Sequence, residues 1–312
     1  MLQLYAIPRE DTNLQYFSLL IIHYSYKDNI YVNYIHIYMT QPKIIVCGCT
    51  KNSSSYIQSH LEKLYLLKSI CSDFHMVIFE NDSTDKTKKI LEEFQSKHEN
   101  TRMIFDTLKD KIKISSNVTK PYSRFVKKPL NLTYARNALL HYVETNYSHF
   151  DYMIMVDLDS VVKNFKPTLV QQILQKYDNS SWDVLTANSD TKYYDIWALR
   201  IYHDVWDQKL HGKLWKEPID YDCWMMKYTK KYVHGNQINI PIDFPLIPVT
   251  SAFGGLGLYK ISSIIGCRYN AEFDNSITCE HVHFHDQIIK KGGKIFICPD
   301  LVVRSQCRGV GI

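Results

Sequence analysis

The chain has 312 residues, of which 45% are hydrophobic, and 37 Lys and Arg against 32 Asp and Glu give it a formal net charge of +5. A chain of this length and composition can bury a large core, which excludes disorder as its main state. The basic residues are spread along the chain instead of forming a dense block. That argues against a dedicated nucleic-acid binder and favours an anionic small-molecule substrate or a weakly basic surface.

The sequence offers no apolar stretch of the roughly 18 to 20 residues that a transmembrane helix needs, and residues 17–22 are too short for a signal-peptide core. The eight cysteines form no CxxC pair, so we expect reduced, buried thiols. These features predict a cytoplasmic protein with no transmembrane segment. Residues 1–42, rich in Tyr and without clear periodicity, are expected to be an extension of uncertain order, with Met39 a candidate natural start.

From residue 43 the sequence alternates short apolar runs with helical patterns, which is typical of a parallel sheet with helices on its faces. The expected strands are residues 43–47, 75–79, 103–105, 152–156, 182–185 and 294–298. The expected helices are residues 54–70, one that follows a cap at Asp82 or Ser83, 132–143, one at Pro167, and 280–291. Pro299 is expected to end the last strand. This order predicts an α/β fold.

Two segments do not fit this alternation. The Lys-rich residues 109–128 are expected to form a mobile loop that could close as a lid. Residues 186–250 are irregular and rich in Tyr and Trp. We expect them to shape an irregular, aromatic-rich acceptor lobe.

Two aspartates directly follow the central expected strand. Tyr152 to Val156 is apolar throughout and runs straight into Asp157-Leu158-Asp159. On an extended strand end, residues two apart project from the same side, so the two carboxylates repel each other unless a cation neutralises them. Hard cations such as Mg²⁺ or Mn²⁺ accept carboxylate oxygens and fill their other positions with phosphate and water. The pair therefore predicts a metal site that clamps a diphosphate; solvated turn aspartates are the alternative.

Three segments, in this order, resemble GT-A glycosyltransferases, particularly the family 2-like group. They are Glu80-Asn81-Asp82-Ser83-Thr84-Asp85-Lys86-Thr87, Ala135-Arg136-Asn137 and Asp157-Leu158-Asp159. The resemblance implies a GT-A, Rossmann-like, mostly parallel sheet flanked by helices, and a nucleotide-sugar donor. It also implies that Glu80 or Asp82 contacts the nucleotide and that Arg136 forks onto phosphate or ribose oxygens. Cys49 and Thr50, after the first strand, are further candidate donor-binding residues.

The C-terminal segment extends the resemblance. The family's acidic pair, Gly and strand ending in Pro are matched by Glu280-His281, Gly292 and Pro299, with His281 where an Asp usually stands. In inverting members this pair supplies the base that deprotonates the acceptor hydroxyl. Glu280 is therefore our first candidate for the catalytic base and His281 the second.

Other candidates lie near these motifs. GT-A enzymes often recruit a third metal ligand close to the acidic pair, and His283, with His285 close behind, is the candidate here. Tyr193 to Arg200 resembles a segment of fungal capsule-associated mannosyltransferases, which implies that Asp195 meets sugar hydroxyls. Gly254-Gly255 would let the backbone approach the sugar closely. The alternatives are that the two histidines lie at the surface or only pack, that the aromatic residues only fill the core, and that the two glycines form a simple turn.

Together these features predict a hexosyltransferase that uses Mn²⁺ or Mg²⁺ to move a sugar from a UDP- or GDP-linked donor to a hydroxyl of a glycan or glycoprotein. Residues 43–312 would form the GT-A domain, with residues 43–165 binding the nucleotide sugar and residues 166–312 the acceptor. A nucleotidyltransferase is one alternative, although residues 47–52 make a poor phosphate loop. An inactive glycan-binding module of the same shape is the other. Inverting and retaining chemistry both stay open.

Overall fold

The computed structural model describes residues 41–304 except 110, 113–119, 221–228 and 274–275, with the backbone alone for residues 120–127, 229, 273 and 276 and for three strands before residue 39. The chain separates into two compact units, Met1–Pro42 and Lys43–Ile312. In the first unit, an antiparallel sheet has the order β1-β2-β3. Its strands are β1 (Gln3–Tyr5), β2 (Phe17–Tyr26) and β3 (Asn29–Tyr38). The sequence pattern did not predict these strands.

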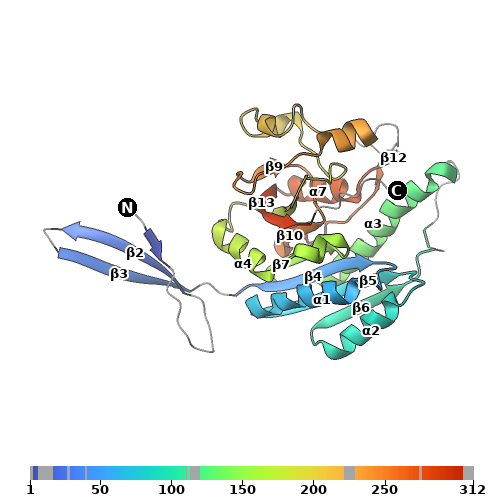
Figure 1. The fold of residues 1–312 in the computed structure, drawn as a ribbon, viewed down its shortest axis with the longest axis horizontal. Helices are drawn as coiled ribbons and strands as arrows, with labels where there is room; N and C mark the ends of the chain where they lie inside the picture. Colours follow the sequence, from blue (N-terminus) through green and yellow to red (C-terminus); the bar gives the residue numbers. More distant parts are fainter. Residues whose placement is uncertain are drawn as a thin grey trace. The chain divides into compact units, whose positions relative to one another are not determined.

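An eight-stranded sheet organises the second unit, in the order β6-β5-β4-β7-β10-β8-β13-β9 (Figure 1). Its strands are β4 (Lys43–Thr50), β5 (Asp73–Asn81), β6 (Thr101–Asp106), β7 (Tyr152–Asp157), β8 (Val184–Ser189), β9 (Ile247–Val249), β10 (Leu256–Lys260) and β13 (Ile295–Val303). The pairs β6-β5, β5-β4, β4-β7 and β8-β13 are parallel, whereas β10 and β9 run antiparallel to their neighbours. The predicted α/β fold with a mostly parallel sheet is confirmed, but the sequence pattern did not predict β10 in the middle of it.

Helices cover both faces of the sheet. Successive strand residues point to opposite faces, so a strand that is apolar throughout presents apolar side chains on each face for helices to cover. The helices are α1 (Ile57–Tyr65), α2 (Thr87–Lys97), α3 (Lys120–Asn146), α4 (Pro167–Lys176), α6 (Ile261–Ile264) and α7 (Glu280–Lys290). Ile44 and Val46 of β4 share one buried cluster with α1, α2 and α4. Ile45 and Cys47 share a second cluster with α3 and α7. The apolar run from Ile44 to Cys47 therefore supports a core on each face of the sheet.

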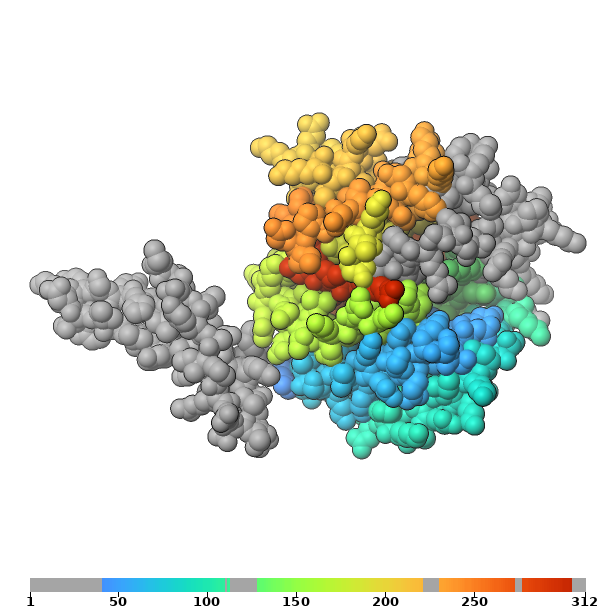
Figure 2. Space-filling model, in the orientation of Figure 1, coloured from blue at the N-terminus to red at the C-terminus, as the bar shows by residue number. Residues whose placement is uncertain are grey.

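Short elements connect these parts. The helical turns are η1 (Leu66–Ile70), η2 (Ser160–Asn164), η3 (His203–Val205), η4 (His211–Lys213), η5 (Thr229–Val233) and η6 (His234–Asn236), and a small hairpin pairs β11 (Glu272–Phe273) with β12 (Ser276–Ile277). Most of these turns fall in the predicted aromatic-rich lobe. In Figure 2 the part of this lobe after residue 230 (yellow to orange) lies on the opposite side of the view from residues 43–106 (blue to teal).

Helix α3 is longer than the sequence predicts. Residues 120–128, which we expected in a mobile loop, are helical, and the helix continues through Pro129. Proline removes one backbone donor, so sequence alone places a boundary there. The predicted mobile loop is therefore wrong for residues 120–128, while residues 110 and 113–119 lie outside the described part of the chain. Neither α3 nor any other helix among the described residues has the length and apolar character needed to cross a membrane.

Strand β13 does not end at Pro299. It pairs with β9 only over Ile295–Ile297, so the proline lies beyond the end of that neighbour. On the other side, the register with β8 shifts between Cys298 and Val302. The side chain of Asn188 donates to the Pro299 carbonyl at 3.1 Å. A bulge thus accommodates the residue that lacks a backbone donor.

Candidate active site

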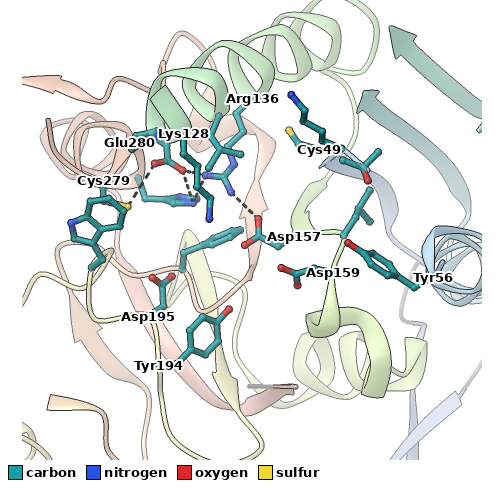
Figure 3. A pocket seen from close by; sticks show the side chains of 18 residues that line it. Cys49, Tyr56, Lys128, Arg136, Asp157, Asp159, Tyr194, Asp195, Cys279 and Glu280 are labelled. Atoms are coloured by element: carbon teal, nitrogen blue, oxygen red, sulfur yellow. Dashed lines mark hydrogen bonds and ion pairs between the residues drawn. The ribbon is translucent and has the colours of Figure 1, made fainter. Parts of the chain in front are cut away.

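The two aspartates at the end of β7 face a cavity, and the residue between them is buried. Leu158 is 3% exposed and belongs to the buried cluster that contains α1 and α2. Gly48 makes room for it, since a Cβ at that position would lie 2.8 Å from Leu158 Cγ. Figure 3 shows the carboxylates of Asp157 and Asp159 directed into one pocket.

This pocket has a volume of about 360 Å³, within the range of small-molecule sites. It brings together eight of the residues selected from the sequence: Cys49, Thr50, Arg136, Asp157, Asp159, Asp195, Glu280 and His281. The other selected residues do not line it: Glu80, Asp82, Gly254, Gly255, His283 and His285. The strand-end aspartates, the Arg136 helix and the Glu280-His281 pair therefore meet at one place.

Arg136 of α3 lies at the centre of the charged wall of the pocket. Its guanidinium donates to Asp157 Oδ1 at 2.9 Å, to Glu280 Oε1, and to His281 Nε2 at 2.8 Å. Burial opposes its charge, but Glu280 and Asp157 outweigh this effect and raise the pKa of Arg136. The guanidinium that we expected to bind phosphate or ribose is thus committed to two carboxylates and an imidazole of the site itself.

Three carboxylates, those of Asp157, Asp159 and Asp195, face the same space (Figure 3). Burial, with the charges of Asp159 and Asp195, raises the pKa of Asp157 to about 7 against the lowering effect of Arg136. A cation would relieve this repulsion. No group of three or more His, Cys, Asp and Glu side chains that could hold a metal ion occurs in the described part of the chain. A bound ion would therefore take Asp157 and Asp159 and complete its shell with water or phosphate oxygens, which suits Mg²⁺ or Mn²⁺.

Glu280 and His281 begin α7 at the back of the pocket. Glu280 is 5% exposed and is paired with Arg136. His281 is 2% exposed and stacks on Phe253 with ring centres 3.9 Å apart. Burial, and then the charge of Arg136, lower the pKa of His281 well below its usual value. An imidazole in this state is a poor proton acceptor, which favours Glu280 as the candidate base.

The structure does not bring His283 and His285 to the pocket. His285 is fully buried, and its two ring nitrogens lie 3.1 Å from Ser251 Oγ and 3.1 Å from Tyr259 OH. Both nitrogens are therefore occupied inside the core. His283 is half-buried on another face of α7 and likewise stands outside the pocket. We therefore correct their predicted role as metal ligands, and the packing alternative describes His285.

His285 is expected to make stability depend on pH. Burial, with the charge of Arg136, lowers its pKa from 6.5 to about 3. Between these values the unfolded chain binds a proton that the folded chain does not, so stability falls as pH drops from 6.5 toward 3, by up to about 1.4 kcal/mol per pH unit. Urea denaturation from pH 6.5 to 4.5 should give a shallower slope for His285→Gln than for wild type. His283→Gln, on the same helix, should keep the wild-type slope; equal slopes in all three would contradict the prediction.

The loop after β5 is tied to the loop after β4 by side chains. Ser83 Oγ accepts from the Asn52 amide at 2.9 Å, and Thr87 Oγ1 accepts from the Ser53 amide at 2.7 Å. Asp85 accepts from the amide of Thr87, the first residue of α2, at 2.9 Å. Since α2 begins at Thr87, the predicted cap at Asp82 or Ser83 is wrong; Asp85, just before the N-cap residue Lys86, accepts from the first amide of the helix. These bonds hold two loops together at the carboxyl edge of the sheet.

Glu80 and Asp82 belong to this loop network. Glu80 is 4% exposed, and its Oε1 accepts from the Ser83 amide at 2.8 Å. Asp82 Oδ2 accepts from the Leu108 amide at 3.2 Å. Both carboxylates therefore fix the backbone of the loops after β5 and β6, and a nucleotide contact by either stays a prediction.

Gly254 and Gly255 allow their backbone to pack closely against neighbouring segments of the site. Gly254 has φ +66°, and a Cβ there would lie 2.2 Å from the Ala187 carbonyl oxygen. Its amide donates to Asp195 Oδ2 at 3.0 Å, and the Gly255 carbonyl accepts from the Asp157 amide at 2.9 Å. The two glycines thus position two acidic residues of the pocket. A direct approach to a sugar by either glycine stays a prediction.

The structure adds pocket residues that sequence reasoning did not select. They are Lys51, Tyr56, Lys128, Pro129, Leu132, Leu158, Tyr194, Trp197, Phe253 and Cys279. Tyr194 and Trp197 belong to the Tyr193–Arg200 segment, whose aromatic side chains the sequence offered only collectively, as faces for sugar C–H groups. Lys128 gave no such signal, because its Lys-rich neighbours suggested a loop instead of the helix that carries it to the pocket.

No protein-family model matches the sequence, and a search of curated proteins finds no match. Similar solved structures include the mannosyltransferase PcManGT from Pyrobaculum calidifontis in complex with GDP-Man and Mn²⁺ (13% identity, TM-score 0.47, covering 87% of this chain and 59% of that one). Another is TarS 1–349 of S. aureus (12% identity, TM-score 0.42, covering 84% and 60%). A third is glucosyl-3-phosphoglycerate synthase from Mycobacterium tuberculosis (10% identity, TM-score 0.39, covering 85% and 69%). The chain thus spans less than two thirds of the first two structures.

Proposed function

We propose that the chain is a metal-dependent glycosyltransferase of the GT-A type, which moves a hexose from a UDP- or GDP-linked donor to a hydroxyl of a glycan or glycoprotein. The observation that carries the proposal is the pair Asp157 and Asp159 at the end of a central strand, facing a pocket that also contains the buried Arg136–Glu280 ion pair. Open α/β sheets bind ligands at the carboxyl ends of their strands. The nucleoside diphosphate that leaves in sugar transfer carries negative charge, and a carboxylate pair can recruit a metal ion that neutralises it.

The residues of the pocket divide into roles under this proposal. A divalent cation held by Asp157 and Asp159 would stabilise the charge of the departing nucleoside diphosphate. Arg136 holds Asp157 and Glu280 in fixed positions through its hydrogen bonds. Glu280 takes the proton of the attacking hydroxyl. Asp195 binds sugar hydroxyls as an acceptor.

The β4 side of the pocket is where we place the nucleotide. Cys49 and Thr50 line the pocket at the end of that strand. Burial raises the pKa of Cys49 to about 12, so its thiol stays protonated and unreactive at neutral pH. Cys49 and Thr50 therefore present neutral side chains beside the acidic pair, and Lys51, which follows them, adds a positive charge to the lining of the pocket.

The test is donor hydrolysis across a panel of UDP- and GDP-sugars, with Mn²⁺ or with EDTA. Wild type is expected to release nucleoside diphosphate from at least one donor with Mn²⁺, and EDTA is expected to stop the release. Asp157→Ala/Asp159→Ala should stay at the EDTA level even with Mn²⁺. Asp286→Ala, which removes an exposed carboxylate on α7, is the control and should behave as wild type.

Other outcomes point to other functions. Undiminished release by the double variant in Mn²⁺ would contradict the metal assignment. Pyrophosphate release from a nucleoside triphosphate and a sugar phosphate would indicate a nucleotidyltransferase. Sugar binding without turnover of any donor would indicate a glycan-binding module.

A further inference from the structure

Three polar groups of the pocket residues are buried without a hydrogen-bond partner among the described residues. They are the Tyr194 hydroxyl, the Trp197 indole N–H and His281 Nδ1. A buried polar group left unpaired costs free energy, so native structures usually satisfy it with protein, water or ligand. All three belong to side chains that line one pocket, which makes them candidates for hydrogen bonds to a ligand.

Arg136 fixes which nitrogen of His281 carries the proton. His281 Nε2 lies 2.8 Å from Arg136 Nη1, and a guanidinium can only donate. The neutral ring therefore accepts at Nε2 and carries its proton on Nδ1. Stacking on Phe253 and an edge contact with Tyr269, at ring-centre distances of 3.9 and 5.4 Å, hold the ring in place. His281 thus presents a fixed hydrogen-bond donor at Nδ1.

The Tyr194 and Asp195 groups are held equally firmly. The Tyr194 hydroxyl lies over Gly255, where a Cβ would be 2.6 Å from it, and the Tyr194 carbonyl accepts from Gln237 at 3.1 Å. Asp195 accepts from the Gly254 amide at 3.0 Å. Figure 3 shows Tyr194 and Asp195 side by side on the wall facing Asp157 and Asp159.

We propose that Tyr194, Asp195, Trp197 and His281 form a hydroxyl-binding subsite for one pyranose ring, with Trp197 and His281 as neutral donors, Asp195 as acceptor and Tyr194 as either. A pyranose carries several neutral hydroxyls, each a donor and an acceptor, and its C–H faces pack on aromatic rings. This chemistry matches the subsite, whereas a phosphate would meet Asp195 as a like charge. The inference rests on the proposed function and adds to it the residues that select the sugar.

The ring could belong to the donor or to the acceptor, and titration calorimetry with Mn²⁺ separates the two. The first arm compares UDP with UDP-glucose and GDP with GDP-mannose. The second arm titrates methyl glucosides and methyl mannosides, with and without nucleoside diphosphate. Tyr194→Phe and Trp197→Phe each delete one polar atom of the subsite. Each is expected to weaken binding of the sugar-bearing probe about three- to tenfold while leaving the affinity for UDP and GDP unchanged.

Matched controls exist within the same chain. Tyr193 OH and Trp182 Nε1 are also buried without a described partner, but neither residue lines the pocket. Tyr193→Phe and Trp182→Phe should therefore leave all affinities at the wild-type level. The subsite is overturned if the pocket variants and the controls have the same affinities. It is also overturned if wild type binds UDP-glucose no better than UDP, binds GDP-mannose no better than GDP, and binds no methyl glycoside.

The two proposals can fail separately. Glycoside binding that the pocket variants weaken, without any nucleotide binding by wild type, would keep the subsite and remove the glycosyltransferase function. Nucleotide binding by wild type, with sugar binding that the pocket variants leave unchanged, would keep the glycosyltransferase function and remove the subsite. Side-chain ¹⁵N NMR of His281 gives an independent check: a protonated Nδ1 and a bare Nε2 are expected, and the opposite tautomer would remove His281 from the subsite.

Discussion

Replacing Arg136 by methionine is expected to lower the free energy of unfolding by about 3–5 kcal/mol, because it leaves buried carboxylates without their counter-charge. The Arg136 and Glu280 side chains are 3% and 6% exposed, and no other Lys or Arg is ion-paired with Glu280 in the described part of the chain. Methionine keeps a long apolar stem against Phe253, so the loss of charge is the main change. Urea denaturation at pH 7.5 measures the effect.

An exposed arginine pair in the same chain is the matched control. Arg268 donates to both carboxylate oxygens of Glu144, at 2.7 and 2.6 Å, but its side chain is 43% exposed. Water can solvate both partners after the pair is broken, so Arg268→Met should cost only about 1 kcal/mol or less. Equal losses for Arg136→Met and Arg268→Met would mean that Arg136 does not act as the counter-charge of the pocket.

Glu280→Gln is expected to lower the turnover of donor sugar by about 10²- to 10⁴-fold, the range measured for loss of a general base. Glutamine keeps the size of the side chain and can still accept a hydrogen bond from Arg136, but it cannot take a proton from the attacking hydroxyl. Binding of nucleoside diphosphate with Mn²⁺ should be unchanged, since Glu280 is not among the proposed metal ligands. Single-turnover rates and calorimetric affinities on the same preparation separate the two effects.

Two further variants make this result specific. Glu62→Gln removes an exposed carboxylate of α1 and should leave turnover unchanged. His281→Gln tests the second candidate for the base. Wild-type turnover in Glu280→Gln together with a large loss in His281→Gln would transfer the role of the base to His281.

The sequence predicted the framework of the fold because that framework depends on local patterns. The apolar run from Tyr152 to Val156 has no polar position, as a strand covered on both faces requires, and the structure places it inside the sheet. The alternation of strands and helices likewise follows from residues within each element. β10 could not be predicted in this way, because its place between β7 and β8 depends on pairing with residues far away in the chain.

The pocket could be predicted only in part for the same reason. Asp157 and Asp159 follow from their position at a strand end. The partners of Arg136, in contrast, include a residue 144 positions later, and no spacing rule connects the two. His285 differs from His281 by one helical turn, yet one lines the pocket and the other faces Tyr259 and Ser251. That difference depends on what packs against α7, which the sequence of the helix does not contain.

The position of β10 in the sheet also affects folding while the chain is being synthesised. β10 pairs with β7 along Leu256–Val156 to Lys260–Tyr152, so one edge of β7 has no native partner until roughly a hundred further residues have been synthesised. During that time the edge of an apolar central strand is open to other strands, which is a known route to aggregation. Contacts that distant in sequence also slow folding, because a long loop must close before they form. Truncation of the gene product before residue 256 is therefore expected to leave an insoluble fragment instead of a working half.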